Sequence, residues 1–198
     1  MSAHSRLPDA YLETARLTLR RLTEDDADNL FELDSDPEVM RYLTGGVPHT
    51  REEIVAHELP RYLRYYERYS DYGFWAAIDR ATGEFLGWFH FHPSCEGSEE
   101  IELGYRLKRS AWGKGFATEG SRALIERGFT QLGARKVVAD TLAANLRSWR
   151  VMEALGMKIE GEFVCEECEA PSSSEEERRG VKYALSKADW EASRLSGA

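Results

Sequence analysis

The feature that most constrains the fold is a strand that runs into a glycine-rich turn and then a helix. Apolar side chains alternate with polar or small ones over residues 100–107, the pattern of a half-buried strand. The turn, SAWGKGFATEG at 110–120, opens a helix that carries its apolar and small residues on one face and stops at Gly133. The next strand is expected over 136–141. A strand–helix–strand unit of this kind predicts a right-handed crossover between two parallel strands.

The rest of the chain places this crossover inside a mixed α/β sheet. Five further strands are expected, over 12–22, 74–79, 85–92, 157–164 and 181–185. Helices are expected from residue 23 onward, over 50–72 with a break or kink at Pro60, and over 145–155. Residues 1–198 then form a single domain with a mostly antiparallel central sheet, one parallel crossover and helices on both faces. The segment at about 166–179, rich in Glu and Ser, is expected to be a mobile acidic loop.

Composition and charge exclude several classes of protein. The chain has 26 Lys and Arg against 35 Asp and Glu, a net charge of −9. This balance argues against nucleic-acid binding, which needs a basic face, and suits a basic or amine-bearing substrate. No apolar run approaches the ~18 residues of a membrane span, and the N-terminus lacks the apolar core of a signal peptide. We therefore expect a cytoplasmic protein with neither a membrane nor a nucleic acid as partner.

The glycines of the turn permit two interpretations. The first N–H groups of a helix lack internal partners, and Gly113 and Gly115 remove the side chains that would keep an anion away from them. A pyrophosphate fits such a cradle, but a tight strand-to-helix turn without a ligand accounts for the same residues. The Walker loop is excluded because Phe116 follows Gly115, and the dinucleotide fingerprint because Thr118 stands where a glycine is needed.

What remains resembles the pyrophosphate loop of the GNAT superfamily of N-acetyltransferases. The wider pattern looks like the subgroup that acetylates N-terminal amines of ribosomal proteins. The segments that carry this resemblance are 13–20, 102–105, 112–119, 145–148, 155–157 and 189–190. Ser110 departs from the family, which has Gln or Arg there. Because the loop binds mainly through its backbone, we expect this departure to matter little.

The resemblance implies a coenzyme A site around the turn. The strand end pairs with the pantetheine arm through its backbone, the loop holds the pyrophosphate, and Asn145 contacts pantetheine. The implied binding residues are Tyr105, Arg106, Leu107, Trp112, Gly113, Lys114, Gly115, Phe116, Ala117 and Asn145. Taken alone, Tyr105 and Leu107 also fit the core, and Asn145 fits a helix N-cap. Basic residues that are expected to supply phosphate contacts are Lys108, Arg109, Lys114, Arg147 and Arg150.

Two catalytic residues follow from the same resemblance. Ser148 stands where the ribosomal subgroup has a serine that serves the departing thiolate, whereas Met152 replaces the tyrosine of many other members. A surface or capping serine is the alternative. Glu102 is the first candidate for the base that takes the proton of the amine, and Asp140 is the second.

A metal site is not expected. Cys165 and Cys168 form a CxxC pair that, with His90 and His92, would suggest zinc. The histidines are more than seventy residues away in the sequence, and a second paired motif is missing. His90 and His92 share one strand face and are expected to line the acceptor side or to face solvent.

Together these observations predict an acetyl-CoA-dependent N-acetyltransferase that acts on a primary amine, with a protein or peptide N-terminus as the first candidate. Acetyl-CoA is the expected cosubstrate. One alternative is an enzyme for a small amine such as an antibiotic or a polyamine. Another is a non-catalytic domain that binds acyl-CoA and regulates a partner. The sequence leaves the oligomeric state open, with a homodimer among the options.

Overall fold

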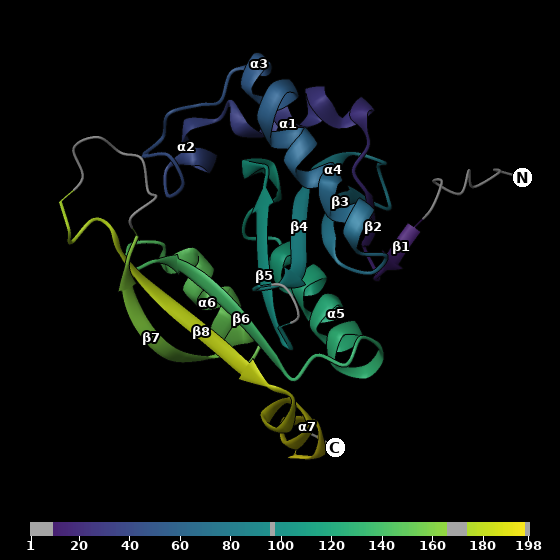
Figure 1. Cartoon of the computed structure of the whole chain (residues 1–198), viewed down its shortest axis with the longest axis vertical. Helices are drawn as coiled ribbons and strands as arrows, with labels where there is room; N and C mark the ends of the chain where they lie inside the picture. The colour runs from purple at the N-terminus through teal and green to yellow at the C-terminus, as the bar shows by residue number, and fades with distance from the viewer. Residues whose placement is uncertain (1–9, 96–97, 166–173, 197–198) are drawn as a thin grey trace, which may run out of the picture.

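The computed structural model describes residues 10–95, 98–165 and 174–196 (Figure 1). The strands are β1 (Ala10–Glu13), β2 (Leu17–Arg21), β3 (Gly73–Asp79), β4 (Phe85–Pro93), β5 (Glu100–Leu107), β6 (Lys136–Leu142), β7 (Lys158–Val164) and β8 (Arg179–Ser186). The helices are α1 (Ala27–Asp34), α2 (Pro37–Met40), α3 (Arg51–Glu53), α4 (Leu59–Arg68), α5 (Phe116–Gln131), α6 (Leu146–Ala154) and α7 (Lys187–Ser196). Shorter helical turns are η1 (Glu24–Asp26), η2 (Ile54–Glu58) and η3 (Arg109–Ala111).

The strands form one sheet in the order β1-β2-β3-β4-β5-β6-β8-β7. The pair β5–β6, which α5 connects, is parallel, and the other neighbouring pairs are antiparallel. The expected mixed sheet with one parallel crossover is therefore confirmed.

Two local features differ from the sequence-based expectation. The first strand divides into β1 and β2, which pair with each other as a hairpin. The interruption expected at Pro60 is present: the α-helical pattern gives way to η2, a π-helical turn, and α4 begins just before the proline, at Leu59. The helix α7 was not expected. It packs on α5 through Trp190, whose ring centroid lies 5.4 Å from that of Phe129.

The sheet divides at β5 and β6 into two wings. These strands pair at Glu100–Lys136, Ile101–Val137 and Glu102–Val138, near their N-terminal ends. Beyond Glu102 they diverge, and β6, β8 and β7 turn away from the rest of the sheet (Figure 1). A V-shaped gap therefore opens beside the C-terminal half of β5.

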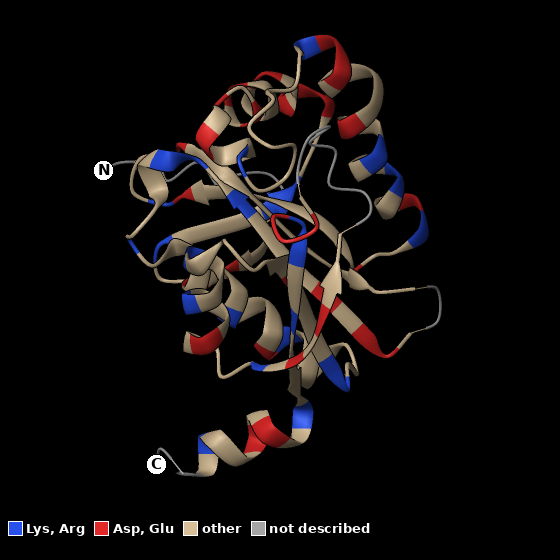
Figure 2. Cartoon of the chain, turned by 90° about the vertical axis from the view of Figure 1, so that its left-hand side faces the viewer, with Lys and Arg blue, Asp and Glu red and all other residues tan. Residues whose placement is uncertain are grey.

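Ion pairs join the wings at the base of this gap. Lys136 Nζ lies 2.9 Å from Glu100 Oε2 and 2.5 Å from Glu160 Oε1, and Lys182 Nζ lies 3.0 Å from Glu100 Oε1. Acidic and basic residues are interspersed along the elements of both wings (Figure 2). Local ion pairs of this kind neutralise many of the charged side chains, and the charge that they leave is the net negative charge of the chain.

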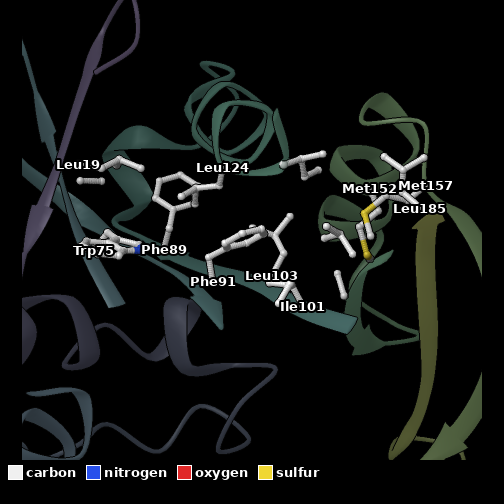
Figure 3. Close-up of a cluster of buried hydrophobic side chains, with 14 of the residues drawn as sticks. Leu19, Trp75, Phe89, Phe91, Ile101, Leu103, Leu124, Met152, Met157 and Leu185 are labelled. Atoms are coloured by element: carbon white, nitrogen blue, oxygen red, sulfur yellow. The ribbon is translucent and has the colours of Figure 1, made fainter. Parts of the chain in front are cut away.

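Helices cover both faces of the sheet, as expected. On one face α5 lies close to β4, because Gly120 and Gly128 face Phe89 and Phe91, in the core shown in Figure 3. A Cβ at these glycines would lie 2.4 Å from Phe89 and 2.6 Å from Phe91. On the other face Tyr62 of α4 stacks on Phe74, with ring centroids 4.2 Å apart.

Candidate active site

The backbone of β5 faces the gap with alternate residues. Lys108 N–H donates to Leu86 O at 2.8 Å, so in the antiparallel β4–β5 ladder the groups of Leu103, Tyr105 and Leu107 point the other way, toward β6. The Leu107 carbonyl accepts from Trp112 Nε1 at 2.8 Å. The backbone groups of Tyr105 and the N–H of Leu107 therefore line the gap, where an extended ligand could pair with them.

Arg106 has a different environment from its neighbours. Alternation turns its backbone toward β4, and its buried side chain pairs with Asp34 and lies over the Trp88 ring, 5.0 Å from the centroid. Asp34 ends α1, so this ion pair attaches the N-terminal helices to β5. The structure thus gives the Arg106 side chain a place in the scaffold of the site. Because the backbone of Arg106 pairs with β4, it is not turned toward the gap for the coenzyme contact that the sequence suggested.

The glycine-rich turn places the start of α5 next to the gap. Gly113 and Gly115 have φ of 70° and 82°, the left-handed region that other residues rarely adopt, and Gly115 is the N-cap of α5. The tight-turn interpretation is thus sufficient to explain both glycines. The turn is also open: a Cβ added at Gly113 would meet no described atom within 4 Å. Room for an anion and the positive end of a 16-residue helix meet here, so the turn fits a pyrophosphate.

A residue that the sequence analysis did not single out holds this turn. Arg16 donates from Nη1 to Lys114 O at 2.8 Å, pairs with Glu119 at 2.6 Å and lies over the Phe116 ring. Burial alone would raise the pKa of Glu119, but hydrogen bonds from Thr14 and Arg16 outweigh it and lower that pKa. Arg16 falls within the resembling segment 13–20, which was the available signal.

Ser148, Asn145 and Tyr105 meet at the start of α6. Asn145 caps the helix with Oδ1, which accepts from Ser148 N–H at 3.4 Å, and its Nδ2 donates to Ser148 Oγ and to Thr141 Oγ1, both at 3.2 Å. Tyr105 Oη lies 3.2 Å from Ser148 Oγ, and burial raises the pKa of Tyr105, which keeps its hydroxyl protonated. Since Asn145 performs the capping, the hydroxyl of Ser148 is left for another role.

The carboxylates lie on the opposite face of the gap. Glu102 is paired across β5–β6 with Val138, so Asp140, two residues further along β6, shares its face. Burial raises the pKa of Asp140, and the nearby negative charge of Glu102 adds to the rise, whereas Lys182 opposes it. Ser148 and Glu102 therefore approach the gap from opposite sides.

The basic residues near the turn are partly engaged elsewhere. Lys108 pairs with Glu32 at 2.7 Å and Arg109 with Asp36 at 3.2 Å, on α1 and just before α2. Arg147 lies over the Trp112 ring, 4.5 Å from its centroid, and so joins the start of α6 to the turn. Arg147, and Lys114 within the turn itself, are therefore the basic residues expected to meet a phosphate there.

Other kinds of site receive no support in the described part of the chain. Over residues 10–95, 98–165 and 174–196, His, Cys, Asp and Glu form no group of three that could hold a metal ion. Cys168 and most of the loop at 166–179 lie outside these residues. Within the same described ranges, no helix has both the length and the apolar character needed to cross a membrane.

Comparison with known proteins defines the class of this arrangement. A family model described as an acetyltransferase (GNAT) domain matches residues 16–158. The FsC-acetyl coenzyme A-N(2)-transacetylase of Aspergillus fumigatus is 30% identical over 186 residues, which cover 90% of this chain and 77% of that protein. The protein is thus an acyltransferase that uses acetyl-CoA as cosubstrate and acts on an amine acceptor. It belongs to the GNAT family of N-acetyltransferases.

Solved structures agree on the fold. A GNAT-family acetyltransferase from Bacillus anthracis superposes with a TM-score of 0.72 at 25% identity, covering 89% of this chain and 98% of that one. Two more distant structures are a ribosomal-protein-S5-alanine acetyltransferase from Vibrio fischeri (TM-score 0.71, 16% identity, 90% and 97% covered) and a spermidine N-acetyltransferase from Vibrio cholerae in complex with CoA and spermine (0.71, 18%, 89% and 99%). At these identities they show a shared fold alone.

Proposed function

We propose that the protein transfers the acetyl group of acetyl-CoA to the primary amine at the N-terminus of a peptide or protein. The observation that carries this proposal is the gap between β5 and β6. Ser148 beside Tyr105 on one side of the gap, Glu102 on the other face of β5, and the unpaired backbone of β5 between them support the proposal.

The coenzyme would be held along three segments of the gap. The backbone of Tyr105 and Leu107 pairs with the pantetheine arm, and Asn145 contacts it from α6. The turn at 112–117 receives the pyrophosphate on the N–H groups that begin α5, with Arg16 holding the turn in shape. Trp112 and Arg147 close the turn on the side of α6.

Each residue then has a stated task in the transfer. The thioester supplies an activated acetyl carbonyl, and a backbone N–H of β5 stabilises negative charge that develops on its oxygen. Glu102 accepts the proton that the attacking ammonium must lose, directly or through water. Ser148, hydrogen-bonded to Asn145 and Tyr105, donates to the departing sulfur.

The identity of the acceptor rests on weaker support than the chemistry. The segments that resemble the ribosomal subgroup favour a peptide N-terminus. The shared fold does not discriminate between acceptors, because the Vibrio fischeri enzyme and the Vibrio cholerae spermidine N-acetyltransferase both superpose with a TM-score of 0.71. A small amine is the second candidate. The Aspergillus fumigatus relative, which aligns over 90% of this chain, is named as a transacetylase that acts at an N(2) atom.

The test is a panel assay. Thiol release from acetyl-CoA is followed with N-terminal peptides, aminoglycosides and polyamines, and mass spectrometry locates the acetyl group. We expect the fastest release with peptides and acetylation at the α-amine. Faster release with a small amine would identify small amines, and not peptides, as the acceptor class. Tight coenzyme binding without release on any acceptor would instead support a regulatory acyl-CoA-binding domain.

A further inference from the structure

A histidine of β4 reaches Glu102 through a space left by a glycine. His90 is paired across β4–β5 with Gly104, and its ring lies on the same face as Glu102. A Cβ added at Gly104 would lie 2.4 Å from His90 Nε2, closer than real Cβ contacts come. Gly104 has an ordinary φ, so a turn conformation does not explain it. Its small size matters here because it leaves room for the imidazole.

The ring of His90 is confined and aimed. Its Nε2 lies 3.6 Å from Glu102 Oε1, and its side chain is 17% exposed against 36% for Glu102. Aromatic rings surround it on its other sides: Phe74 at 5.5 Å, Trp88 at 5.9 Å and His92 at 4.9 Å between centroids. The imidazole therefore lies between the aromatic layer and the carboxylate at the gap.

The surroundings of His90 favour its neutral form. Burial lowers its pKa well below the usual range, and positive charge from His92 on β4, Arg61 on α4 and Arg106 on β5 adds to this effect. A hydrogen bond to the Leu103 backbone acts in the opposite direction. A neutral imidazole that faces a carboxylate is stable when the nearer nitrogen carries the hydrogen. We assign the Nε2–H tautomer to His90 on this ground.

We propose that His90 is a positioning residue, whose imidazole, through the Nε2 edge that faces Glu102, orients the carboxylate of Glu102 toward the gap. This inference rests on the proposed function, in which Glu102 accepts the proton of the amine. It gives Gly104 a role as well, since a Cβ there would displace the imidazole from its position beside Glu102.

Paired variants separate hydrogen bonding from packing. His90→Leu removes the donor and His90→Gln keeps one. We expect kcat to fall about tenfold in His90→Leu and to stay within about threefold of wild type in His90→Gln. The KM for acetyl-CoA should stay unchanged in both. Gly104→Ala should reproduce His90→Leu, and the same two substitutions at exposed His57 serve as controls. Equal losses of kcat in both His90 variants would reduce His90 to packing.

A second readout does not depend on acetyl transfer. The ¹⁵N shifts of the His90 ring report its tautomer directly in the wild-type protein. We expect Nε2–H at neutral pH, and a changed tautomer ratio in Glu102→Gln. A ring protonated at Nδ1, or ¹⁵N shifts that do not change in Glu102→Gln, would overturn the proposal even in an active enzyme. An inactive protein whose His90 ring responds to Glu102→Gln would instead contradict the proposed function and retain the contact.

Discussion

Ser148 on α6 and Glu102 on β5 face the gap from opposite sides, and each lies next to a polar side chain that affects its chemistry. Ser148 receives a hydrogen bond from Asn145 and lies beside the Tyr105 hydroxyl; with Tyr105 as the donor of that contact, the Ser148 hydrogen is left for a departing sulfur. Glu102 lies beside His90 and shares its face with Asp140. Hydroxyl and carboxylate on opposite sides of the gap suit a transfer between two substrates that are held between them.

Ser148→Ala tests the role of the hydroxyl. If Ser148 serves the departing sulfur, kcat should fall about 10- to 100-fold while coenzyme A affinity by calorimetry stays nearly constant, because that contact forms mainly in the transition state. The melting temperature should change little, since Asn145 makes the cap. Ser193→Ala on α7 is the matched control. A large loss of thermal stability with an unchanged rate per folded molecule would show a structural role instead.

Glu102→Gln tests the base. The variant should slow the reaction at neutral pH, and the deficit should shrink as the pH rises, because a larger fraction of the amine is then already neutral. Rates are measured with one acceptor from pH 6 to about 10, spanning the range where amines titrate. A wild-type profile would reassign the role to Asp140 or to water, and Asp140→Asn in the same series distinguishes these two.

Among the elements, the turn between β5 and α5 is explained both by its backbone conformation and by the space that it leaves for a ligand. Positive φ at Gly113 and Gly115 explains their presence, and the open space at Gly113 adds the capacity to receive a ligand. Arg16, in the turn between β1 and β2, contacts Lys114, 98 residues further along the chain, so the β1–β2 hairpin contributes to the turn before α5.

The turn can be tested with a pair of matched glycines. Gly113 and Gly133 have φ of 70° and 73°, and a Cβ at either would meet no described atom within 4 Å. Asparagine tolerates this conformation better than most residues, so both Gly→Asn variants should fold. We expect Gly113→Asn to weaken coenzyme A binding about tenfold, a loss of ~1.4 kcal/mol, and Gly133→Asn to leave it unchanged. Equal affinities by calorimetry would favour the plain-turn interpretation.

The crossover and the sheet were predictable because they depend on local patterns. Alternation over 100–107, the glycines and the Asn145 cap each act within a few residues. The contacts that complete the site could not be read in this way. Arg16 with Glu119, Arg106 with Asp34 and His90 with Glu102 join segments that are distant in sequence and meet only in the tertiary fold.

For the whole molecule, stability depends on how closely α5 approaches the sheet. Gly120 allows this approach by facing the ring of Phe89, which is fully buried in the larger core (Figure 3). Because the turn leads directly into α5, the distance between α5 and the sheet also determines where the turn lies relative to the gap. The core and the candidate site therefore share one geometric constraint.

Gly120→Ala tests this constraint. Its Cβ would lie 2.4 Å from Phe89 Cζ. Overpacking of this kind costs about 1–3 kcal/mol, more than the ~1 kcal/mol that alanine gains over glycine in a helix. The free energy of unfolding, measured with denaturant, should therefore fall. Gly161→Ala on β7, where a Cβ would meet no described atom within 4 Å, should leave it nearly unchanged. Equal stabilities of the two variants would contradict the close packing of α5.

We expect coenzyme A to lie in the gap between β5 and β6 with its pyrophosphate on the turn before α5. A titration of the ¹⁵N-labelled protein with coenzyme A, followed through its assigned backbone amides, tests this placement. We predict that the largest shifts fall on Tyr105, Leu107, Gly113, Gly115, Phe116 and Asn145. Binding that leaves the signals of these amides unchanged and shifts those of a different surface would show that the coenzyme lies elsewhere.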